Sequence, residues 1–597
     1  MQLMKPIASE EIPVGTDWVY EVKYDGFRCV LEWTESSIKL ISRNDKDLTA
    51  NFPEIIAYCR EIEELVSEDL PLLLDGELVV LNNPYQANFS WIQKRGRLKH
   101  KEPIAIAADQ RPASFMAFDL LSHKGGSMTG KPFTKRKNTL LRLLRKAEQY
   151  IQLVPFYEDS KELWTKLFLY KGEGIVAKRK SSQYGDAKKH RDWYKIKNWR
   201  TVEGFLTFYD PENSYFTVSI YDQGEVRQLG KSKHGLESDE FSALKDLFTI
   251  NGEKVSSGYR LPPAVCAQIH TLDLYKNELR EPEFHQLLPQ KNPAECTAGK
   301  LALDISMLPE AVEPTNTDKI FWPQADVTKG DLLVYMREIA PYMLPFLKGR
   351  RLTLIRCPDG VEKESFFQKH LPDYAPDFIN GIKDGGEEFF IADSLDSLIW
   401  FANHGAIEYH IPFQTVDTEN PTEIVFDLDP PDRSAFPLAI HAAELLKQML
   451  DDLELVSFVK TSGGKGLQVH IPIPCDSMTY EQTGVFTEAI AKTLAGEYPD
   501  QFTVERMKRN RHGRLYIDYV QHAKDKTLVA AYSPRKSEDA TVAAPLFWEE
   551  VKHGLTPASY TVTNMVARVQ SDGCPFADYF KARKKQTMEK VLNLVKQ

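Results

Sequence analysis

The sequence predicts an α+β multidomain protein. Its 597 residues exceed what one hydrophobic core can organise, and a chain of this length commonly forms about three or four domains. Segments with strand-like alternation are interleaved with segments of helical spacing. Residues 289–314 have little periodicity and are rich in Pro, Asn, Ala, Gly, Thr and Glu, which predicts a linker. We therefore expect domains over residues 1–200, 201–288 and 315–597, with residues 289–314 as the linker.

The composition excludes several classes of protein. Residues 1–15 lack the apolar core of a signal peptide, and no apolar run is long enough to span a bilayer. The seven cysteines are scattered singly and form no CxxC pair, so neither a zinc site nor a disulfide framework is indicated. We expect no membrane association and a reducing, cytoplasmic environment.

The positive charges are clustered although the net charge is −10. A protein that is basic all over is excluded, but nucleic acid binding depends on where the basic residues lie. They gather in residues 94–101, 188–200, 506–514 and 581–585. Any one cluster could be a solvated face. Four clusters together favour a partner with a phosphate backbone.

The first candidate centre is Glu21-Val22-Lys23-Tyr24-Asp25-Gly26-Phe27-Arg28. A lysine amine attacks phosphorus only when neutral, and its ordinary pKa is about 10.4. We expect burial or cationic neighbours to lower that pKa. The Asp-Gly pair predicts a tight turn that aims the amine into a pocket. The competing interpretation is a surface lysine before a turn.

Acids inside apolar strands come next along the chain. Strands are expected over residues 18–42 and helices over 52–66 and 137–149. The strand at residues 72–80 carries Asp75 and Glu77, which are costly to bury unless paired or functional. Similar acids occur in the strands at 115–121 and 173–178. In the strand at 193–197, Lys195 and Lys197 share one face, as beneath an anion.

These residues suit one chemistry. A lysine attacks a nucleotide α-phosphate, pyrophosphate leaves, and the nucleotide passes to a second acceptor. The order and spacing resemble those of covalent nucleotidyltransferases, specifically ATP-dependent DNA ligases with an ATP-grasp-like adenylation domain. The matching motifs are Lys23-Tyr24-Asp25-Gly26, Ser42-Arg43-Asn44, Asp75-Gly76-Glu77, Phe118-Asp119, Glu173-Gly174-Ile175-Val176-Ala177-Lys178 and Lys195-Ile196-Lys197.

The resemblance implies a role for each motif residue. Lys23 would carry the AMP, Glu21 would read the adenine amino group, and Phe118 would stack on adenine. Glu173 would bind a metal ion. The ribose and phosphate contacts would come from Arg28, Arg43 and Glu77, and further phosphate contacts from Lys178, Lys195 and Lys197.

Residues 201–288 resemble the OB-fold β-barrel that follows the adenylation domain in ligases. Short strands are separated by turn sequences there, and the fold suits nucleic acid. Residues 280–284 resemble the closing segment of that barrel. Related ligases carry Arg-x-Asp-Lys near its end, whereas this chain reads Leu288-Pro289-Gln290-Lys291. The role of the barrel in lysine adenylylation is therefore left open.

The second half opens with an expected helix over residues 328–347. Thr328 is a plausible N-cap, and Lys319 and Lys329 beside the helix N-terminus predict an anion site. Phe366 and Phe367 lie beside cations, which fits either core packing or stacking on a base.

The second candidate centre is a set of carboxylates. Asp427 and Asp429 share one face of a strand that Pro430 ends, and Asp518 lies in another strand. Oxygen ligands suit Mg²⁺ or Mn²⁺. Three carboxylates suit two-metal phosphoryl transfer, with metal ions about 3.5–4 Å apart.

A glycine loop lies between these acids, in Lys460-Thr461-Ser462-Gly463-Gly464-Lys465-Gly466. It does not match a P-loop, and Pro472 and Pro474 exclude the helix that should follow one. Its backbone N–H groups can still cradle a triphosphate.

Residues 316–575 resemble the polymerase domain of bacterial end-joining ligase D, an archaeo-eukaryotic primase-like polymerase domain. The resemblance implies metal binding by Asp427, Asp429 and Asp518. It implies contacts to a 5′-phosphate at a DNA break by Asn316, Lys319 and Lys329, stacking by Phe366 and Phe367, and nucleotide contacts by Ser462, Lys465 and Arg535. The family usually has His where this chain has Gln468; whether His470 takes over is open.

With the ligase first, the domain order resembles the Bacillus-type enzyme. We expect a bifunctional double-strand-break repair enzyme that fills or extends DNA ends and seals nicks through a lysyl-AMP. The resemblance implies ATP and Mg²⁺ or Mn²⁺ as cofactors, double-stranded DNA ends and nicks and nucleoside triphosphates as substrates, and a Ku homologue as partner. We expect a cytoplasmic monomer, nucleoid-associated when bound to DNA. No segment is assigned to the phosphoesterase domain that related chains often carry.

Two alternatives remain at this point. The first half could be an RNA ligase or a capping-type guanylyltransferase, which share the lysine motif. The second half could be a non-catalytic module that binds DNA ends. The choices between ribonucleotides and deoxyribonucleotides and between Mg²⁺ and Mn²⁺, and the arrangement of the domains, are open.

Overall fold

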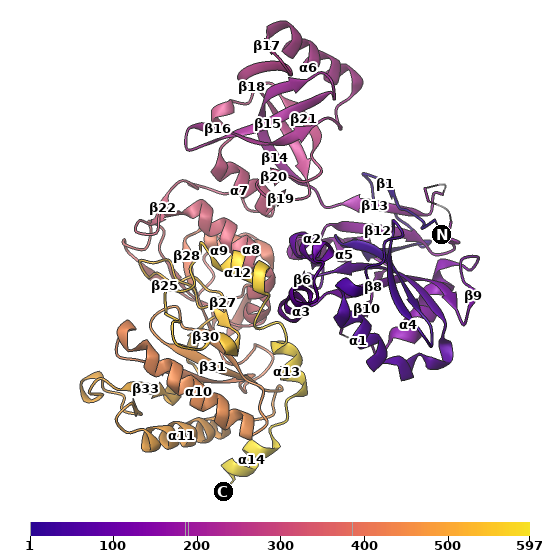
Figure 1. The fold of residues 1–597 in the computed structure, drawn as a ribbon. Helices are drawn as coiled ribbons and strands as arrows, with labels where there is room; N and C mark the ends of the chain where they lie inside the picture. Colours follow the sequence, from indigo (N-terminus) through magenta and orange to yellow (C-terminus); the bar gives the residue numbers. More distant parts are fainter. Residues whose placement is uncertain (1, 148, 186, 189, 385, 597) are drawn as a thin grey trace. The chain divides into compact units, whose positions relative to one another are not determined.

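A computed structural model describes residues 2–596 except 148, 186, 189 and 385. Lys189 of the second basic cluster therefore lies outside the described residues. The chain divides into two compact units (Figure 1). Met1–Ile305 with Gln570–Asp572 form the first, and Ser306–Val569 with Gly573–Gln597 form the second. None of the helices in the described part of the chain combines the length and apolar character of a membrane span.

The first unit begins with a domain of two sheets, residues 2–199, which we call the two-sheet domain. One sheet has the order β1 (Ile7–Ala8), β13 (Trp193–Lys197), β12 (Gly174–Arg179), β2 (Trp18–Val22), β11 (Phe156–Tyr157). The other has the order β10 (Ile151–Leu153), β8 (Ser114–His123), β5 (Leu72–Val79), β3 (Phe27–Trp33), β4 (Ile38–Ser42), with β9 (Gly126–Ser127) beside β8. The helices are α1 (Pro53–Glu61), α2 (Phe89–Arg97), α3 (Lys101–Gln110), α4 (Phe133–Leu144) and α5 (Ser160–Tyr170).

In the sheet that contains β3 and β5, core residues and cavity residues lie on opposite faces. Cys29, Leu31 and Trp33 of β3 enter the main core of this domain, together with Leu74 and Leu78 of β5. The side chains of Arg28 and Glu77 therefore project from the opposite face, because successive residues of a strand alternate. The core that fixes the fold thus also aims these polar side chains.

A barrel follows in the same unit. Its sheet has the order β16 (Glu225–Ser232), β15 (Tyr215–Asp222), β14 (Arg200–Asp210), β18 (Gly258–Thr271), β17 (Glu253–Val255), and β21 (Glu283–Leu288) also pairs with β18. Helix α6 is Ser238–Asn251, and β19 (Leu274–Tyr275) pairs with β20 (Glu278–Leu279). The strands expected from the sequence are present, each somewhat longer than its apolar run.

The expected linker is partly folded. Helix α7 (Ala298–Ser306) lies within residues 289–314, and Cys296 and Leu301 are buried in the core of the barrel. A segment that buries apolar side chains in this way is anchored, so residues 293–306 pack on the barrel instead of forming a free connection. The sparse apolar residues of this stretch did not predict that packing.

The second unit is built on two larger sheets. The first has the order β32 (Phe502–Thr503), β33 (Leu515–Asp518), β29 (Glu423–Asp429), β31 (Leu467–Pro472), β30 (Phe458–Thr461), β35 (Pro545–Leu546). The second has the order β25 (Phe366–Gln368), β24 (Thr353–Arg356), β28 (Ala406–Pro412), β34 (Thr527–Val529). Two hairpins pair β22 (Ile320–Trp322) with β23 (Val327–Thr328) and β26 (Gly381–Asp384) with β27 (Glu387–Phe390).

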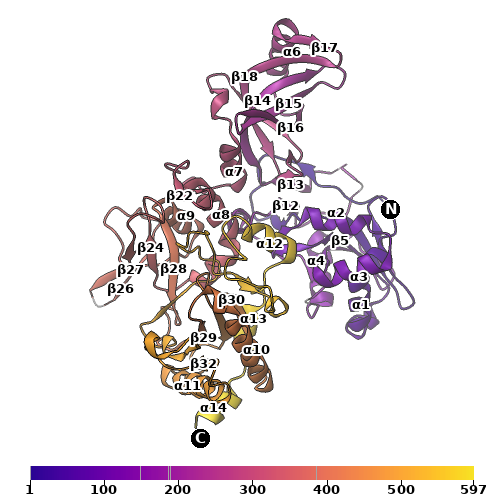
Figure 2. The ribbon, with the colours of Figure 1, turned by 60° about the vertical axis from the view of Figure 1, so that its left-hand side comes forward.

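Helices cover one face of the first of these sheets. They are α10 (Phe436–Asp452) and α11 (Tyr480–Glu497), which lie beside β29 (Figure 2). Ile424, Phe426 and Leu428 share a core with both helices, so Asp427 and Asp429 project from the other face. The remaining helices are α8 (Lys329–Leu347), α9 (Leu395–Asn403), α12 (Met565–Asp572), α13 (Tyr579–Lys585) and α14 (Glu589–Val595).

The expected helix N-terminus at Thr328 is confirmed. The Thr328 hydroxyl accepts the N–H of Asp331, and the Asp331 carboxylate accepts the N–H of Thr328, which completes a capping box for α8. By contrast, α4 begins at Phe133, four residues before the expected start, because Phe133 and Arg136 also belong to its buried face.

Candidate active sites

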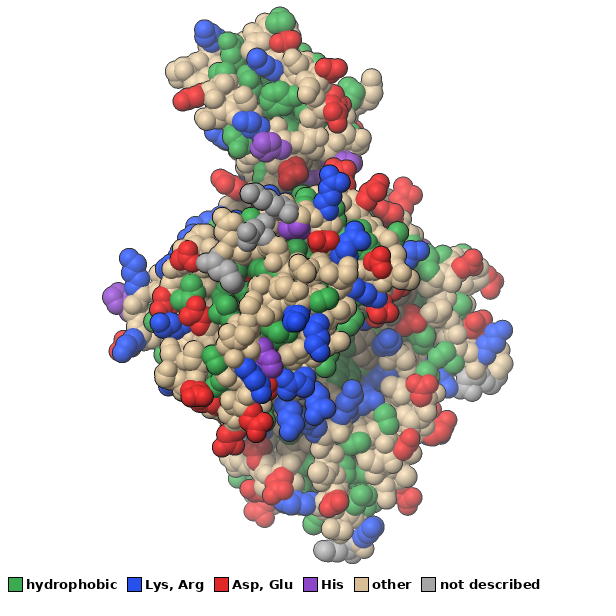
Figure 3. All heavy atoms as spheres, turned by 90° about the vertical axis from the view of Figure 1, so that its right-hand side faces the viewer, with side chains coloured by type: hydrophobic (Ala, Val, Ile, Leu, Met, Phe, Trp, Pro, Cys, Tyr) green, Lys and Arg blue, Asp and Glu red, His purple; other side chains and the backbone are tan. Residues whose placement is uncertain are grey.

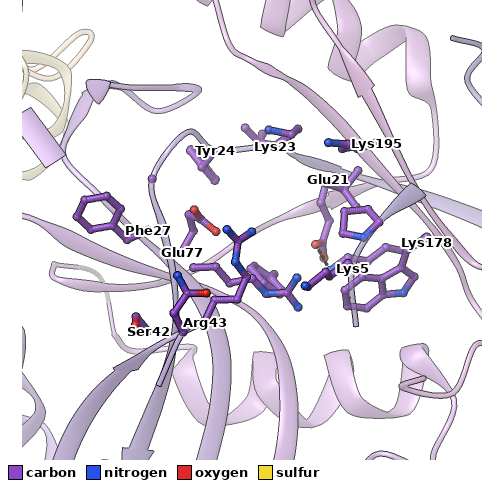
Figure 4. A pocket seen from close by; sticks show the side chains of 18 of the residues that line it. Lys5, Glu21, Lys23, Tyr24, Phe27, Ser42, Arg43, Glu77, Lys178 and Lys195 are labelled. Carbon is purple, nitrogen blue, oxygen red and sulfur yellow. Dashed lines mark ion pairs between the residues drawn. The ribbon is translucent and has the colours of Figure 1, made fainter. Parts of the chain in front are cut away.

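A cavity of about 560 Å³ opens between the two sheets of the two-sheet domain (Figure 4). This volume is in the range of small-molecule sites. Eight of the nucleotide-binding residues expected from the sequence line it: Glu21, Lys23, Arg28, Arg43, Glu77, Phe118, Lys178 and Lys195. The separate motifs therefore converge on one cavity.

Lys23 and Lys195 lie at one end of the cavity (Figure 4). Lys23 Nζ forms an ion pair with Glu173 Oε1. Burial acts to lower the pKa of Lys23, but the charges of Glu173, Asp25 and Glu77 outweigh it and hold that pKa above its ordinary value. The expected lowering of the Lys23 pKa is therefore not found, because the lysine has a carboxylate partner. Burial lowers the pKa of Lys195, and the charges of Lys23 and Lys197 add to this.

Glu21 also lines the cavity and lies between two buried lysines. Lys137 Nζ is 2.6 Å from Glu21 Oε1, and Lys178 Nζ is 2.6 Å from Glu21 Oε2. Lys178 also lies over the rings of Phe118 and Trp193, with its Nζ 4.6 and 4.3 Å from their centroids. The carboxylate is thus fixed next to the aromatic side chains.

Lys178 lies away from the ion pair of Lys23. It follows Glu173 by five positions along an extended segment, which corresponds to roughly 16 Å. Lys23 pairs with Glu173, and Lys178 pairs with Glu21. The phosphate contact that the resemblance implies for Lys178 stays a prediction.

Arg28 and Glu77 also line the cavity. Arg28 makes two hydrogen bonds to Asp75, from Nε to Oδ1 at 3.1 Å and from Nη2 to Oδ2 at 2.7 Å. Tyr184 donates its hydroxyl to the same carboxylate at 2.6 Å. Asp75 is therefore occupied in orienting Arg28. Burial raises the pKa of Glu77 to about 8, and the charge of Arg28 partly opposes this shift.

Lys197 departs from the expectation. It does not line the cavity, and its Nζ lies 2.8 Å from Glu281 and 3.5 Å from Glu283, both from the end of the barrel. Neighbouring Arg280 bonds Asp25 at 2.6 and 3.2 Å. The carboxylates beside Lys197 thus come from the barrel, and its contact to phosphate stays a prediction.

Lys291 is the lysine that remains in the Leu288-Pro289-Gln290-Lys291 segment, and it forms ion pairs within the barrel region. Its Nζ lies 3.0 Å from Glu203 and 2.8 Å from Glu295. These contacts tie the segment before α7 to strand β14. They account for the lysine without a role in lysine adenylylation.

In the second unit the carboxylates lie on adjacent strands. The register places Asp427 of β29 directly opposite Asp518 of β33 and, on its other side, opposite Gln468 of β31. Gln468 Nε2 donates to Asp427 Oδ1 at 3.1 Å. Burial raises the pKa of Asp427 to about 6; Gln468 opposes this shift, and the like charges of Asp429 and Asp518 add to it.

Asp429 is held by cations. Lys465 Nζ lies 3.0 Å from its Oδ1 and Arg511 Nη1 lies 3.1 Å from its Oδ2. Among the described residues no three His, Cys, Asp or Glu side chains converge closely enough to hold a metal ion. The donor set of Asp427, Asp429 and Asp518 still fits Mg²⁺ or Mn²⁺ by its chemistry, because carboxylate oxygens on adjacent strands are hard ligands.

His470 does not take the place of the family histidine. It lies on the same face as Gln468, but its Nδ1 is 2.9 Å from Glu423 Oε2, in a buried group with Arg350 and Tyr579. Gln468 occupies the position beside Asp427. The pairing of β31 with β29 is the reason: it places Gln468 opposite Asp427, whereas His470, two residues further along β31, lies opposite Val425.

The glycine loop is shaped by Ser462, whose hydroxyl accepts the N–H groups of Gly464 and Gly466 at 3.2 and 3.1 Å. Gly463 has a φ of 68°, which favours glycine. A Cβ at Gly466 would lie 2.0 Å from the carbonyl oxygen of Leu428, at the end of β29. The loop is therefore packed against the strand that carries Asp427 and Asp429.

Replacing Gly466 with alanine is expected to lower the free energy of unfolding by about 1–3 kcal/mol, the usual cost of overpacking. The added methyl group must displace backbone, because its nearest neighbour is a carbonyl oxygen. Gly464→Ala is the matched control: its Cβ would meet only Ser462 Oγ at 3.5 Å. Urea unfolding of both variants measures the difference, and equal stabilities would contradict the packing described here.

The residues expected at a DNA 5′-phosphate gather at the N-terminus of α8. Lys329 N donates to the carbonyl of Lys319, and Lys319 N donates to the carbonyl of Asn316. Burial lowers the pKa of Lys329 to about 8, and the charge of Lys319 adds to this shift. The Lys319 side chain donates to the carbonyl of Pro358 at 2.9 Å and pairs with the Asp359 carboxylate. The Lys329 side chain donates to the carbonyl and the hydroxyl of Thr315 at 2.6 and 3.0 Å.

Phe366 and Phe367 are exposed, at 42% and 72%, on the edge strand β25. The core-packing alternative is therefore wrong for both, and the rings are free to stack on a base. The guanidinium of Arg356 lies 5.2 Å from the ring centroid of Phe366. Arg535, expected at the nucleotide, pairs with Glu408 at 3.3 Å.

The basic clusters contain both structural and surface residues. Arg95 is buried and pairs with Glu54, whereas Lys94, Arg97, Lys99 and Lys101 are exposed. The surface view in Figure 3 shows Lys and Arg side chains gathered in one area, with Asp and Glu spread around it. Electrostatic attraction to a phosphate backbone is therefore local and is compatible with a negative net charge.

Several functional contacts were missed by sequence reasoning. Lys137 and Tyr184 hold Glu21 and Asp75 from segments far away in the chain. Arg511 belonged to a basic cluster but had no assigned partner. Lys460 is fully buried beside Gln468, and burial lowers its pKa to about 7, with the charge of Arg535 adding to the shift. The sequence feature that could have identified Lys460 is its position as a charged residue inside a buried strand.

Comparison with known proteins matches both halves of the chain. Residues 3–197 match the ATP dependent DNA ligase domain, and residues 328–576 match the LigD primase-polymerase domain. The chain is 39% identical to the bifunctional non-homologous end joining protein LigD of Bacillus subtilis, over 99% of each chain. It is 26% identical to the multifunctional non-homologous end joining protein LigD of Pseudomonas aeruginosa, over 96% of this chain and 72% of that one.

Among solved structures, the polymerase domain from Mycobacterium tuberculosis ligase D in complex with DNA is 30% identical. The match covers 46% of this chain and 99% of that one, with a TM-score of 0.42.

Proposed function

The chain belongs to the LigD family of bifunctional non-homologous end joining proteins, and we propose that its two units carry out the two reactions at independent centres. The first unit contains an ATP-dependent DNA ligase domain and the second a primase-polymerase domain. This assignment decides against an RNA ligase, a capping guanylyltransferase and a non-catalytic module. The observation that carries the proposal is that the lysine cavity and the carboxylate row lie in different units.

The ligase reaction begins at Lys23. Its Nζ attacks the α-phosphorus of ATP, so that an N–P bond forms, the bond to the leaving pyrophosphate breaks, and the amine gives its proton to Glu173, its ion-pair partner. Lys195, at the same end of the cavity, neutralises phosphate charge. Glu21 and Phe118, which line the same cavity, hold the adenine. The AMP then passes to the 5′-phosphate at a nick, and the 3′-hydroxyl displaces it.

The polymerase reaction uses the face of β29 that the helices leave uncovered. Asp427, Asp429 and Asp518 would hold the divalent cations, Mg²⁺ or Mn²⁺, which supply positive charge to the reacting phosphates. Ser462, Lys465 and Arg535 would contact the incoming nucleotide. The DNA end would be held through its 5′-phosphate by Asn316, Lys319 and Lys329, with Phe366 and Phe367 stacked on a base. In the ligase domain Glu173 would hold the cation.

The partners follow from this assignment. We propose that the protein acts as a monomer on double-stranded DNA ends and nicks, takes nucleoside triphosphates, and is recruited by a Ku homologue. We place it in the cytoplasm, on the nucleoid when it is bound to DNA.

Incubation with labelled ATP or labelled GTP tests the ligase assignment. The chain is expected to become labelled by ATP, because the cavity fixes a carboxylate, Glu21, where the adenine amino group can donate to it. Labelling by GTP alone would refute the assignment. A gapped break tests both units together: joined product is expected only when nucleoside triphosphates and ATP are both present, and joining without gap filling would contradict the proposal.

A further inference from the structure

Four polar side chains form a row across four neighbouring strands of the second unit. Lys460 of β30 lies opposite Gln468 of β31, Gln468 lies opposite Asp427 of β29, and Asp427 lies opposite Asp518 of β33. Residues directly opposite in adjacent strands have neighbouring Cβ atoms. The row therefore connects Lys460 to the carboxylates through a single side chain.

The contacts along the row have a fixed direction. Lys460 Nζ donates to Gln468 Oε1, and Gln468 Nε2 donates to Asp427 Oδ1 at 3.1 Å. A lysine amine at the end of the row can only be satisfied by the amide oxygen, and an ionised carboxylate can only be satisfied by the amide N–H. The two neighbours together select one of the two amide orientations of Gln468.

Lys460 has an unusual environment for a lysine of purely structural role. Its side chain is completely buried, whereas buried lysines usually extend the amine to water or pair it with an acid. Within the described residues, the hydrogen-bond partner of Lys460 Nζ is the neutral amide of Gln468. An apolar side chain of the same length would fill this space without desolvating an amine. The amine is therefore retained for the contact that it makes.

We propose that Lys460 is a positioning residue for nucleotide addition, which holds the Gln468 amide with its N–H toward Asp427 and so fixes that carboxylate beside Asp518. The proposal rests on the proposed role of Asp427. Without Lys460 the Gln468 amide is free to rotate, and its oxygen would then oppose the Asp427 carboxylate. Lys460 acts through Gln468 and touches no reacting atom itself.

A double-mutant cycle tests this proposal in the full-length protein. Primer extension is measured for Lys460→Met, Gln468→Ala and the double variant, with kcat and the KM for nucleotide determined separately. Each single variant is expected to lower kcat by about 10- to 100-fold, the usual effect of losing a residue that orients a metal-binding side chain. The KM is expected to change less than about twofold, because neither residue contacts the nucleotide.

The double variant decides the mechanism. If Lys460 acts through Gln468, the double variant has the same kcat as Gln468→Ala. Multiplied losses would overturn the proposal, since Lys460 would then act elsewhere, and so would an unchanged kcat in Lys460→Met. Lys447→Met is the matched control, because Lys447 is a lysine at the surface of α10 that pairs with Asp451. It is expected to keep the parent kcat.

A second variant guards against misfolding. Gln468→Glu has nearly the same shape and can accept from Lys460, but it cannot donate to Asp427. It is expected to keep the melting temperature, to lose extension, and to bind Mn²⁺ with altered affinity in calorimetry without nucleotide. Full extension by Gln468→Glu would overturn the proposal. Failure of the proposed function itself looks different: extension would then be absent in the parent or unaffected in Asp427→Asn.

Discussion

Replacing Lys23 with alanine is expected to abolish ATP-dependent nick sealing and to leave nucleotide addition unchanged. The loss should be at least about 10³-fold, because the covalent carrier of AMP is removed. The second unit keeps its own carboxylate centre, so extension should stay within about twofold of the parent. Nick sealing and primer extension are measured on the same preparation.

Two controls separate chemistry from folding. Lys23→Arg keeps the ion pair with Glu173 but is too basic to act as a nucleophile, so it should be as inactive as the alanine variant. Lys166→Ala removes a lysine of α5 that pairs with Glu162 at the surface and lies over the ring of Tyr157, and it should seal normally. DNA that already carries AMP on its 5′-phosphate should still be sealed by Lys23→Ala. Normal sealing with ATP by Lys23→Ala would contradict the assignment of this lysine.

The sequence predicted the strands of both centres because polar residues inside apolar runs are conspicuous. Asp427 and Asp429 follow a period of two, and the structure places them on the face opposite the core. The resemblance to ATP-dependent DNA ligases placed Arg28 and Glu77 with Lys23, and all three line one cavity. Alternation gives only the face of a strand on which a residue lies.

Pairing between distant segments could not be predicted. Asp75 was a candidate functional acid, but Arg28 and Tyr184 occupy both of its oxygens. Lys178 and Lys197 were both assigned to phosphate because each is a lysine in a nucleotidyl motif. The partner of each, Glu21 for Lys178 and Glu281 for Lys197, depends on strand register and on the packing of the barrel. Neither is contained in the spacing of a motif.

Removing the carboxylates of the second unit is the complementary experiment. Asp427→Asn is expected to lower primer extension at least about 10³-fold and to leave nick sealing unchanged, because an amide is a far weaker metal ligand than a carboxylate. The double variant Asp427→Ala and Asp429→Ala should be equally inactive. Asp451→Ala, which removes the surface partner of Lys447 on α10, should keep normal extension.

The melting temperature of Asp427→Asn is a second, independent test of the role of this carboxylate. Burial raises the pKa of Asp427 to about 6, so the folded protein pays a penalty to keep this carboxylate ionised at neutral pH. An amide of the same shape removes that penalty, and the variant should melt at the same or a higher temperature. Loss of extension with unchanged or increased stability would mean that the carboxylate is retained for catalysis. Unchanged extension would mean that the reaction does not depend on it, and the metal-binding role of Asp427 would have to be abandoned.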